Sequence, residues 1–209
     1  MKLSEFSFRD LYRQCVILKG ERVYAEVQRF LTELSYEAPP DMDAALCYCY
    51  IDSMAGMSFH FLCVANYETG GIDEKCYEKI LKDKVVLMFR ADPDFEINIY
   101  AEETSLFSSR MNMVEEGYHA DASLLATRDL VEIDHLREKC FPDDIIVFLI
   151  KDGIEPERPW VRLCEFEGEE LFGILLNEPF RDFGLHAGDR VHVKLGTYED
   201  RILAFIDIK

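Results

Sequence analysis

The loop after residue 176 holds the residue types that are best placed to contact a ligand. Asn177, Glu178 and Pro179 follow the apolar run 173–176, and the pair 188–189, Gly-Asp, precedes the next apolar stretch. An asparagine can bond its own turn, and a proline fixes the backbone at the exit of a loop. Glu178 has no such structural explanation, so its carboxylate is the best candidate contact on a stiff loop. The candidate binding residues in this part of the chain are Trp160, Asn177, Glu178 and Pro179.

The segment 92–144 is a second candidate surface because acidic side chains greatly outnumber basic ones in it. A solvated acidic face explains most runs of this kind. The more specific functional alternative is a docking face for a basic partner. Such a docking face would use the glutamate pairs before and within a helix predicted over 104–117. These glutamates are Glu102, Glu103, Glu115 and Glu116.

Neither the cysteines nor the histidines have the spacing of a metal site. Cys47 and Cys49 lie two apart in a predicted strand, whereas zinc sites have two residues between the ligands and a second pair downstream. His119 lies near several carboxylates, but a solvated helix end explains this group better than a hard-metal site does. We therefore predict no metal and no cofactor. The seven cysteines are scattered singly, which predicts reduced thiols.

No sequence motif supports an enzyme. The chain has no phosphate-binding glycine loop, no Gly-x-Ser-x-Gly elbow and no dinucleotide fingerprint. A nucleophilic cysteine with a distant histidine stays open, because such partners meet only in space. Each cysteine, however, lies in an apolar context that suits an inert thiol.

The charge of the chain excludes several classes of partner. The 41 acidic and 23 basic side chains give a formal net charge of -18, which repels phosphate backbones and anionic lipids. We therefore predict neither nucleic acid nor a membrane as partner, and the longest apolar runs are far shorter than the ~20 residues of a membrane span. Glu5, Arg9 and Asp10 interrupt any signal-peptide core, so we predict a cytoplasmic protein.

The periodicity of apolar residues predicts an α+β fold with two units. In the first unit, residues 1–150, helices and an antiparallel sheet are mixed, and the apolar residues between Leu11 and Leu18 predict that the first helix runs to Gly20. Residues 151–159 are charged and contain two prolines and a glycine, which predicts a linker. Only short strands follow it, so residues 160–209 should form a small, strongly bent β-sheet or a partly open barrel.

The C-terminal quarter contains a recurring arrangement of residues. A strand led by Trp160 is followed by a second that ends Gly-x-Leu-x-Asn-x-Pro, at 173–179, and then by Gly-Asp at 188–189 and a closing strand with Asp207. This arrangement resembles an uncharacterised family of small bacterial domains. The resemblance implies the fold of that quarter and no reaction. Some members of the family occur beside toxin systems and look like immunity proteins.

These observations favour a non-enzymatic, cytoplasmic interaction protein. Its specific form would be an immunity-type inhibitor that masks a basic surface of another protein. The alternative class is a small-ligand-binding protein or an enzyme that uses a cleft between the two units, since pockets favour domain interfaces.

Overall fold

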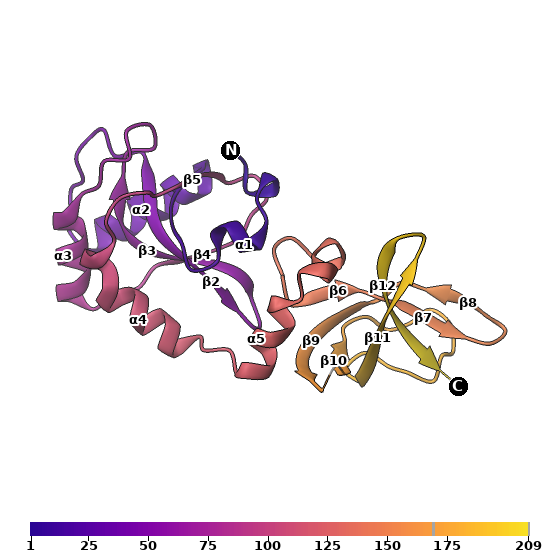
Figure 1. Cartoon of the computed structure of the whole chain (residues 1–209). Coiled ribbons are helices and arrows are strands. Elements are labelled where there is room, and N and C mark those ends of the chain that lie inside the picture. Colours follow the sequence, from indigo (N-terminus) through magenta and orange to yellow (C-terminus); the bar gives the residue numbers. More distant parts are fainter. Residues whose placement is uncertain (169, 209) are drawn as a thin grey trace. The chain divides into compact units, whose positions relative to one another are not determined.

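The computed structural model describes residues 1–168 and 170–208, and it divides into two compact units, residues 1–119 and 120–209 (Figure 1). Glu169 and Lys209, which both belong to the predicted C-terminal unit 160–209, lie outside this description. Helices accompany one antiparallel and one mixed sheet, and the described strands form no closed barrel. The predicted α+β class is confirmed.

The first unit is built on a five-stranded antiparallel sheet in the order β4-β3-β2-β1-β5. Its strands are β1 (Cys15–Lys19), β2 (Ala44–Asp52), β3 (Gly56–Ala65), β4 (Met88–Arg90) and β5 (Glu96–Ile99). The side chains of β2 and β3 are buried along almost their whole length. Both faces of the sheet centre are therefore covered, which is why these strands are continuous runs of apolar and aromatic residues.

Helices α2 (Glu21–Glu33) and α4 (Ser108–Gly117) cover opposite faces of this sheet, and α3 (Glu74–Asp83) packs against β3. Phe30 of α2 meets Phe61 of β3 edge to face, with ring centroids 5.8 Å apart. Phe61 pairs with Cys47, and the next residue of β2, Tyr48, points to the other face. There its hydroxyl donates to Glu115 of α4 at 2.7 Å.

The prediction of one helix from Leu11 to Gly20 was wrong. Helix α1 (Phe8–Leu11) starts with a capping box between Ser7 and Asp10, but it lasts only one turn. Arg13 then has a φ of 63°, and β1 begins at Cys15 between β2 and β5. A short apolar run is compatible with either a helix or a buried strand, and pairing on both sides decided the outcome.

The second unit contains a seven-stranded sheet in the order β6-β9-β10-β11-β12-β7-β8, in which only the described pair β12 and β7 is parallel. Its strands are β6 (Asp144–Ile146), β7 (Phe148–Lys151), β8 (Ile154–Glu157), β9 (Trp160–Glu167), β10 (Glu170–Leu175), β11 (Arg190–Tyr198) and β12 (Arg201–Ile208). Side chains alternate along β10, with Leu171 and Leu175 in the core. Figure 1 shows how strongly these strands twist around that core.

Two short helices cover this sheet: α5 (Ala122–Asp129) packs on β9, and the 3-10 helix η3 (Val131–Leu136) contacts β12. Two bonds of 2.8 Å join the buried Arg128 of α5 to Asp143, and Asp144 holds Arg162 of β9 through bonds of 2.7 and 2.9 Å. Paired charges of this kind can be buried because each ion satisfies the other.

The structure divides at a different place from the predicted boundary at residue 150. The division lies after His119 rather than at 150, and the predicted linker 151–159 forms part of the β7–β8 hairpin. Gly153 has a φ of 78° and makes its turn. Pro156 lies in β8, the edge strand, where a missing backbone N–H breaks no ladder. The glycine and proline that suggested a linker are therefore residues of a hairpin at the edge of the sheet.

Candidate binding groove

A surface groove of about 690 Å³ lies between the start of β9 and the loop that joins β10 to β11. We call it the β9 groove. Its lining residues are Glu157, Arg158, Pro159, Trp160, Leu176, Asn177, Glu178, Pro179 and Phe180. The structure thus brings together the four residues predicted from the C-terminal motif, and it adds an arginine, a second glutamate and a phenylalanine.

Asn177 and Trp160 fix one wall of the β9 groove. The Asn177 Oδ1 accepts a hydrogen bond from the backbone N–H of Trp160 at 2.9 Å, and the Trp160 carbonyl accepts one from Leu176 at 2.9 Å. Asn177 therefore bonds the neighbouring strand instead of its own turn. The two hydrogen bonds hold the backbone of Trp160 against the start of the loop.

Glu178 has the structural partners that its sequence context did not reveal. Its Oε2 accepts from the Ala187 N–H at 2.9 Å, and its Oε1 lies 2.7 Å from the His186 Nδ1. The Ala187 N–H and His186 lower the pKa of the Glu178 carboxyl, and Glu178 in turn raises the pKa of His186. The Glu178 side chain is nevertheless 60% exposed, so an ionised carboxylate is held in place at the rim.

Glu157 fixes the tip of the loop. Its Oε2 accepts from the Phe180 N–H at 2.8 Å and its Oε1 accepts from the Arg181 N–H at 2.9 Å. The Arg181 guanidinium donates to the same carboxylate at 3.2 Å, and only 9% of the Glu157 side chain is exposed. No local sequence signal marks this residue, because its partners lie more than twenty positions away along the chain.

Two phenylalanines of this loop have opposite environments. Phe183 is 1% exposed and packs in the core of the second unit, where it anchors the loop. Phe180 is 97% exposed although Glu157 holds its backbone. The exposed ring thus lines the groove on a loop whose backbone is hydrogen-bonded to Glu157. Sequence reasoning missed Phe180 because an aromatic residue in isolation predicts burial.

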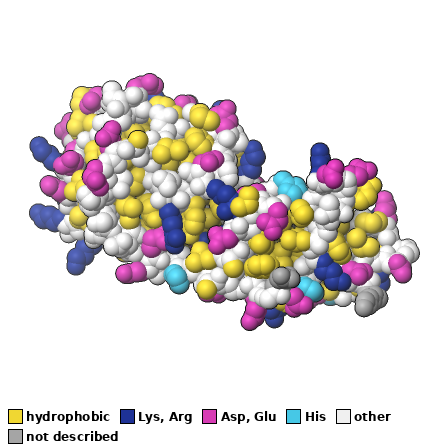
Figure 2. Space-filling model, in the orientation of Figure 1, with side chains coloured by type: hydrophobic (Ala, Val, Ile, Leu, Met, Phe, Trp, Pro, Cys, Tyr) yellow, Lys and Arg dark blue, Asp and Glu magenta, His cyan; other side chains and the backbone are white. Residues whose placement is uncertain are grey.

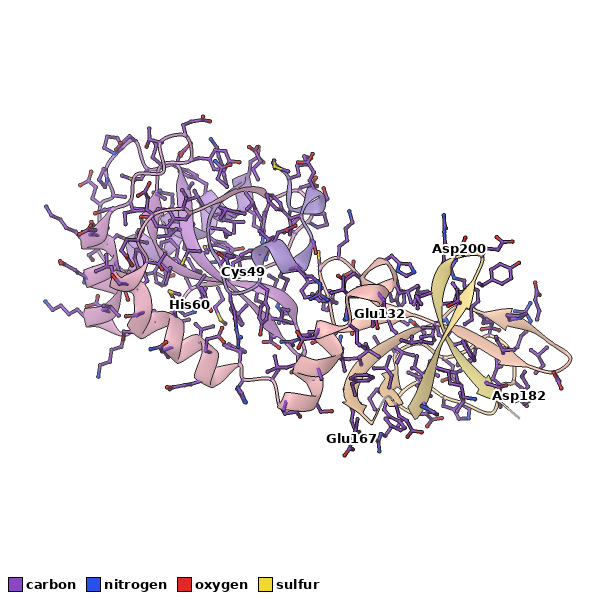
Figure 3. The ribbon with its side chains drawn as sticks, viewed as in Figure 1. Cys49, His60, Glu132, Glu167, Asp182 and Asp200 are labelled. Atoms are coloured by element: carbon purple, nitrogen blue, oxygen red, sulfur yellow. The ribbon has the colours of Figure 1, made fainter. Side chains whose placement is uncertain are left out.

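The cations near the groove are already engaged within the unit. The Arg158 guanidinium lies 5.2 Å from the centroid of the Phe148 ring. Arg181 pairs with Glu155 as well as with Glu157. Figure 3 shows a further carboxylate of this loop, Asp182, at the surface of the second unit.

The structure does not gather the predicted acidic residues of the first unit into one site. Glu102 and Glu103 precede α4, and Glu115 and Glu116 lie in its last turns, about 15 Å along the axis by the rise of a ten-residue helix. Glu103 accepts from the Ser105 N–H at 2.9 Å, which lowers its pKa. Glu115 binds Tyr48 and, at 2.7 Å, Arg13. On the face in Figure 2, acidic side chains are interspersed with hydrophobic ones.

The remaining candidate groups have structural environments. Cys47 and Cys49 are buried, and burial raises the pKa of both thiols, which keeps them protonated and unreactive. Across residues 1–168 and 170–208, no group of three or more His, Cys, Asp or Glu side chains has the geometry of a metal site. In the same residues, no helix is long and apolar enough to cross a membrane.

Comparisons of the chain with models of protein families, with curated proteins and with solved structures gave no match.

Proposed function

We propose that this chain is a non-enzymatic interaction protein of the cytoplasm, and that its β9 groove binds an apolar side chain of a partner protein. The observation that carries the proposal is Phe180, which is 97% exposed on a loop whose backbone donates two hydrogen bonds to Glu157. A rigid aromatic ring offers a large contact area at little cost in conformational entropy. Trp160 lies in the same groove, and tryptophan and arginine dominate binding hot spots.

The charge of the molecule supports a basic partner. A net charge of -18 accelerates association with a positively charged surface and discourages acidic ones. Seven free cysteines support a reducing compartment. An immunity-type inhibitor that covers a basic surface is the specific form of this proposal. The alternative of a ligand-binding protein or enzyme stays a prediction.

The test uses peptides selected from a random phage-displayed library on the immobilised full-length chain. Selected peptides are then titrated against the Phe180→Ala variant. Losing a hot-spot aromatic typically costs on the order of 2 kcal/mol, so we expect affinity to fall more than tenfold. The melting temperature should not change, because the Phe180 ring makes little contact with the fold.

Tyr198→Ala is the matched control, because Tyr198 is a 63% exposed aromatic residue of the same unit outside the β9 groove. It should leave peptide affinity unchanged. Peptides that bind the Phe180→Ala variant as tightly as the native chain would contradict the proposal, as would a library that yields no binder.

A further inference from the structure

The carboxylate of Glu178 keeps part of its bonding capacity free. A carboxylate offers about four acceptor positions, and Glu178 uses one for the Ala187 N–H and one for His186. These two bonds fix the direction of the group, while the side chain is 60% exposed. The Glu178 carboxylate is therefore a charged acceptor at the rim of the groove. It lies two positions before the exposed Phe180 along the chain.

The other charged side chains that line the groove have partners within the unit, whereas the Glu178 carboxylate still has acceptor positions. Glu157 accepts hydrogen bonds from backbone N–H groups and from Arg181, and the Arg158 guanidinium lies over the Phe148 ring. His186 faces Glu178 and also lies within the influence of Asp182 and Asp189. Carboxylates thus outnumber cations around His186, and the local charge has the same sign as the whole molecule.

We propose that the β9 groove recognises a lysine or arginine that adjoins an apolar residue, with the apolar side chain against Phe180 and Trp160 and the cation on Glu178. This inference rests on the proposed function and names the chemistry of its ligand. The occupant is a segment of a basic protein, because both the rim and the net charge of -18 favour a cation. His186 is the internal competitor for the same carboxylate.

The competition gives the site a pH dependence of known sign. Glu178 and the two aspartates raise the pKa of His186 above its ordinary value of 6.5. Below that raised pKa, His186 is charged and neutralises Glu178. Above it, His186 is neutral and Glu178 is free to pair with the ligand, whose lysine stays charged to about pH 10. Affinity for a basic ligand should therefore rise as the pH increases through the pKa of His186.

The probes are two blocked dipeptides, N-acetyl-phenylalanyl-lysine amide and N-acetyl-phenylalanyl-norleucine amide. Each is titrated into the full-length ¹⁵N-labelled chain, and the amide shifts of Phe180, Arg181 and Ala187 are followed. We expect about threefold tighter binding of the lysine peptide at pH 8.5, as an exposed ion pair allows, and a smaller preference at pH 5.5.

Glu178→Gln should abolish the preference for lysine, because glutamine keeps an acceptor for the Ala187 N–H and loses the charge. Glu167→Gln is the matched control: Glu167 is an exposed glutamate of the same unit outside the β9 groove, so net charge changes equally. His186→Gln should remove the pH dependence.

Equal binding of both peptides at all pH values would overturn this inference and leave the groove function standing. Absence of any shift with either peptide would overturn both.

Discussion

At the scale of single residues, Gly173 shows why the Gly-x-Leu-x-Asn-x-Pro arrangement begins with glycine. The pairing of β10 with β9 is irregular between Phe172 and Gly173. A Cβ at Gly173 would lie 2.4 Å from Val161 Cγ1 and 2.6 Å from the Arg162 carbonyl oxygen. The bulge thus brings two backbones so close that no side chain fits between them.

Gly173→Ala should therefore destabilise the second unit by about 2 kcal/mol, the usual cost of overpacking a buried site. Urea unfolding measures the difference. Gly196→Ala is the comparison, because its Cβ would meet the Phe205 ring at 2.9 Å and a ring can rotate away. A Gly173→Ala variant no less stable than Gly196→Ala would show that the backbone at the bulge yields.

His60 gives a second prediction at this scale. It is 1% exposed, neither ring nitrogen has a hydrogen-bond partner among the described residues, and burial, with Arg110 nearby, lowers its pKa to about 4 (Figure 3). An unfolded histidine titrates near 6.5. Between these values the unfolded chain binds the proton and the folded chain does not. Stability contributed by neutral His60 is thus lost as the pH falls from 6.5 towards 4, with a slope approaching about 1.4 kcal/mol per pH unit.

Urea unfolding of the native chain and of His60→Leu at pH 7, 6 and 5 tests this expectation. The free energy of unfolding of the native chain should fall more steeply with acid than that of the variant. His192→Leu, at an exposed position, should follow the native curve. Parallel curves for the native chain and His60→Leu would mean that the folded protein accommodates a charged His60.

At the scale of elements, local sequence patterns predicted those helices and strands whose formation depends mainly on residues close together in the chain. Val23, Val27, Phe30 and Leu31 recur at helical spacing and are buried on α2, and the apolar runs 44–51 and 57–65 pair as the hairpin of β2 and β3. The pattern failed at Cys15–Lys19, where strand pairing overrode helical spacing. The candidate site divides similarly. Local turn chemistry explained Asn177 and Pro179 and left Glu178 as the candidate contact, whereas Glu157 and Phe180 acquire their roles from a contact between distant segments.

The ion pair that fixes α5 provides the prediction for this scale. Arg128 and Asp143 are 4% and 6% exposed and are joined by two hydrogen bonds. Arg128→Ala should lower the stability of the second unit by about 4 kcal/mol, because a buried carboxylate loses its partner. Replacing both, Arg128→Met with Asp143→Leu, should cost much less. Thermal unfolding distinguishes these cases, and equal losses for the single and double variants would show that packing rather than charge holds the helix.

At the scale of the whole molecule, the count of acidic residues overstates the free negative surface. The acidic segment 92–144 crosses the boundary between the units. Many of its carboxylates bond within the fold: Asp121 caps α5, Asp134 pairs with Arg137, Glu138 accepts two backbone N–H groups, and Asp143 and Asp144 hold arginines. Sequence alone gives their number and sign, but only the fold shows which are satisfied internally.

The division after His119 leads to the last prediction, which compares the fragments 120–209 and 160–209. Every ladder of the seven-stranded sheet and its core cluster lie within 120–209, so this fragment should fold alone. Residues 160–209 lack β6, β7 and β8. Strand β12 then loses its parallel partner β7, and Arg162 loses Asp144. Circular dichroism with urea should show a cooperative transition for 120–209 and none for 160–209. A cooperative transition in the shorter fragment would restore the boundary that the prolines of 151–159 suggested and would make the β7–β8 hairpin an accessory to the fold.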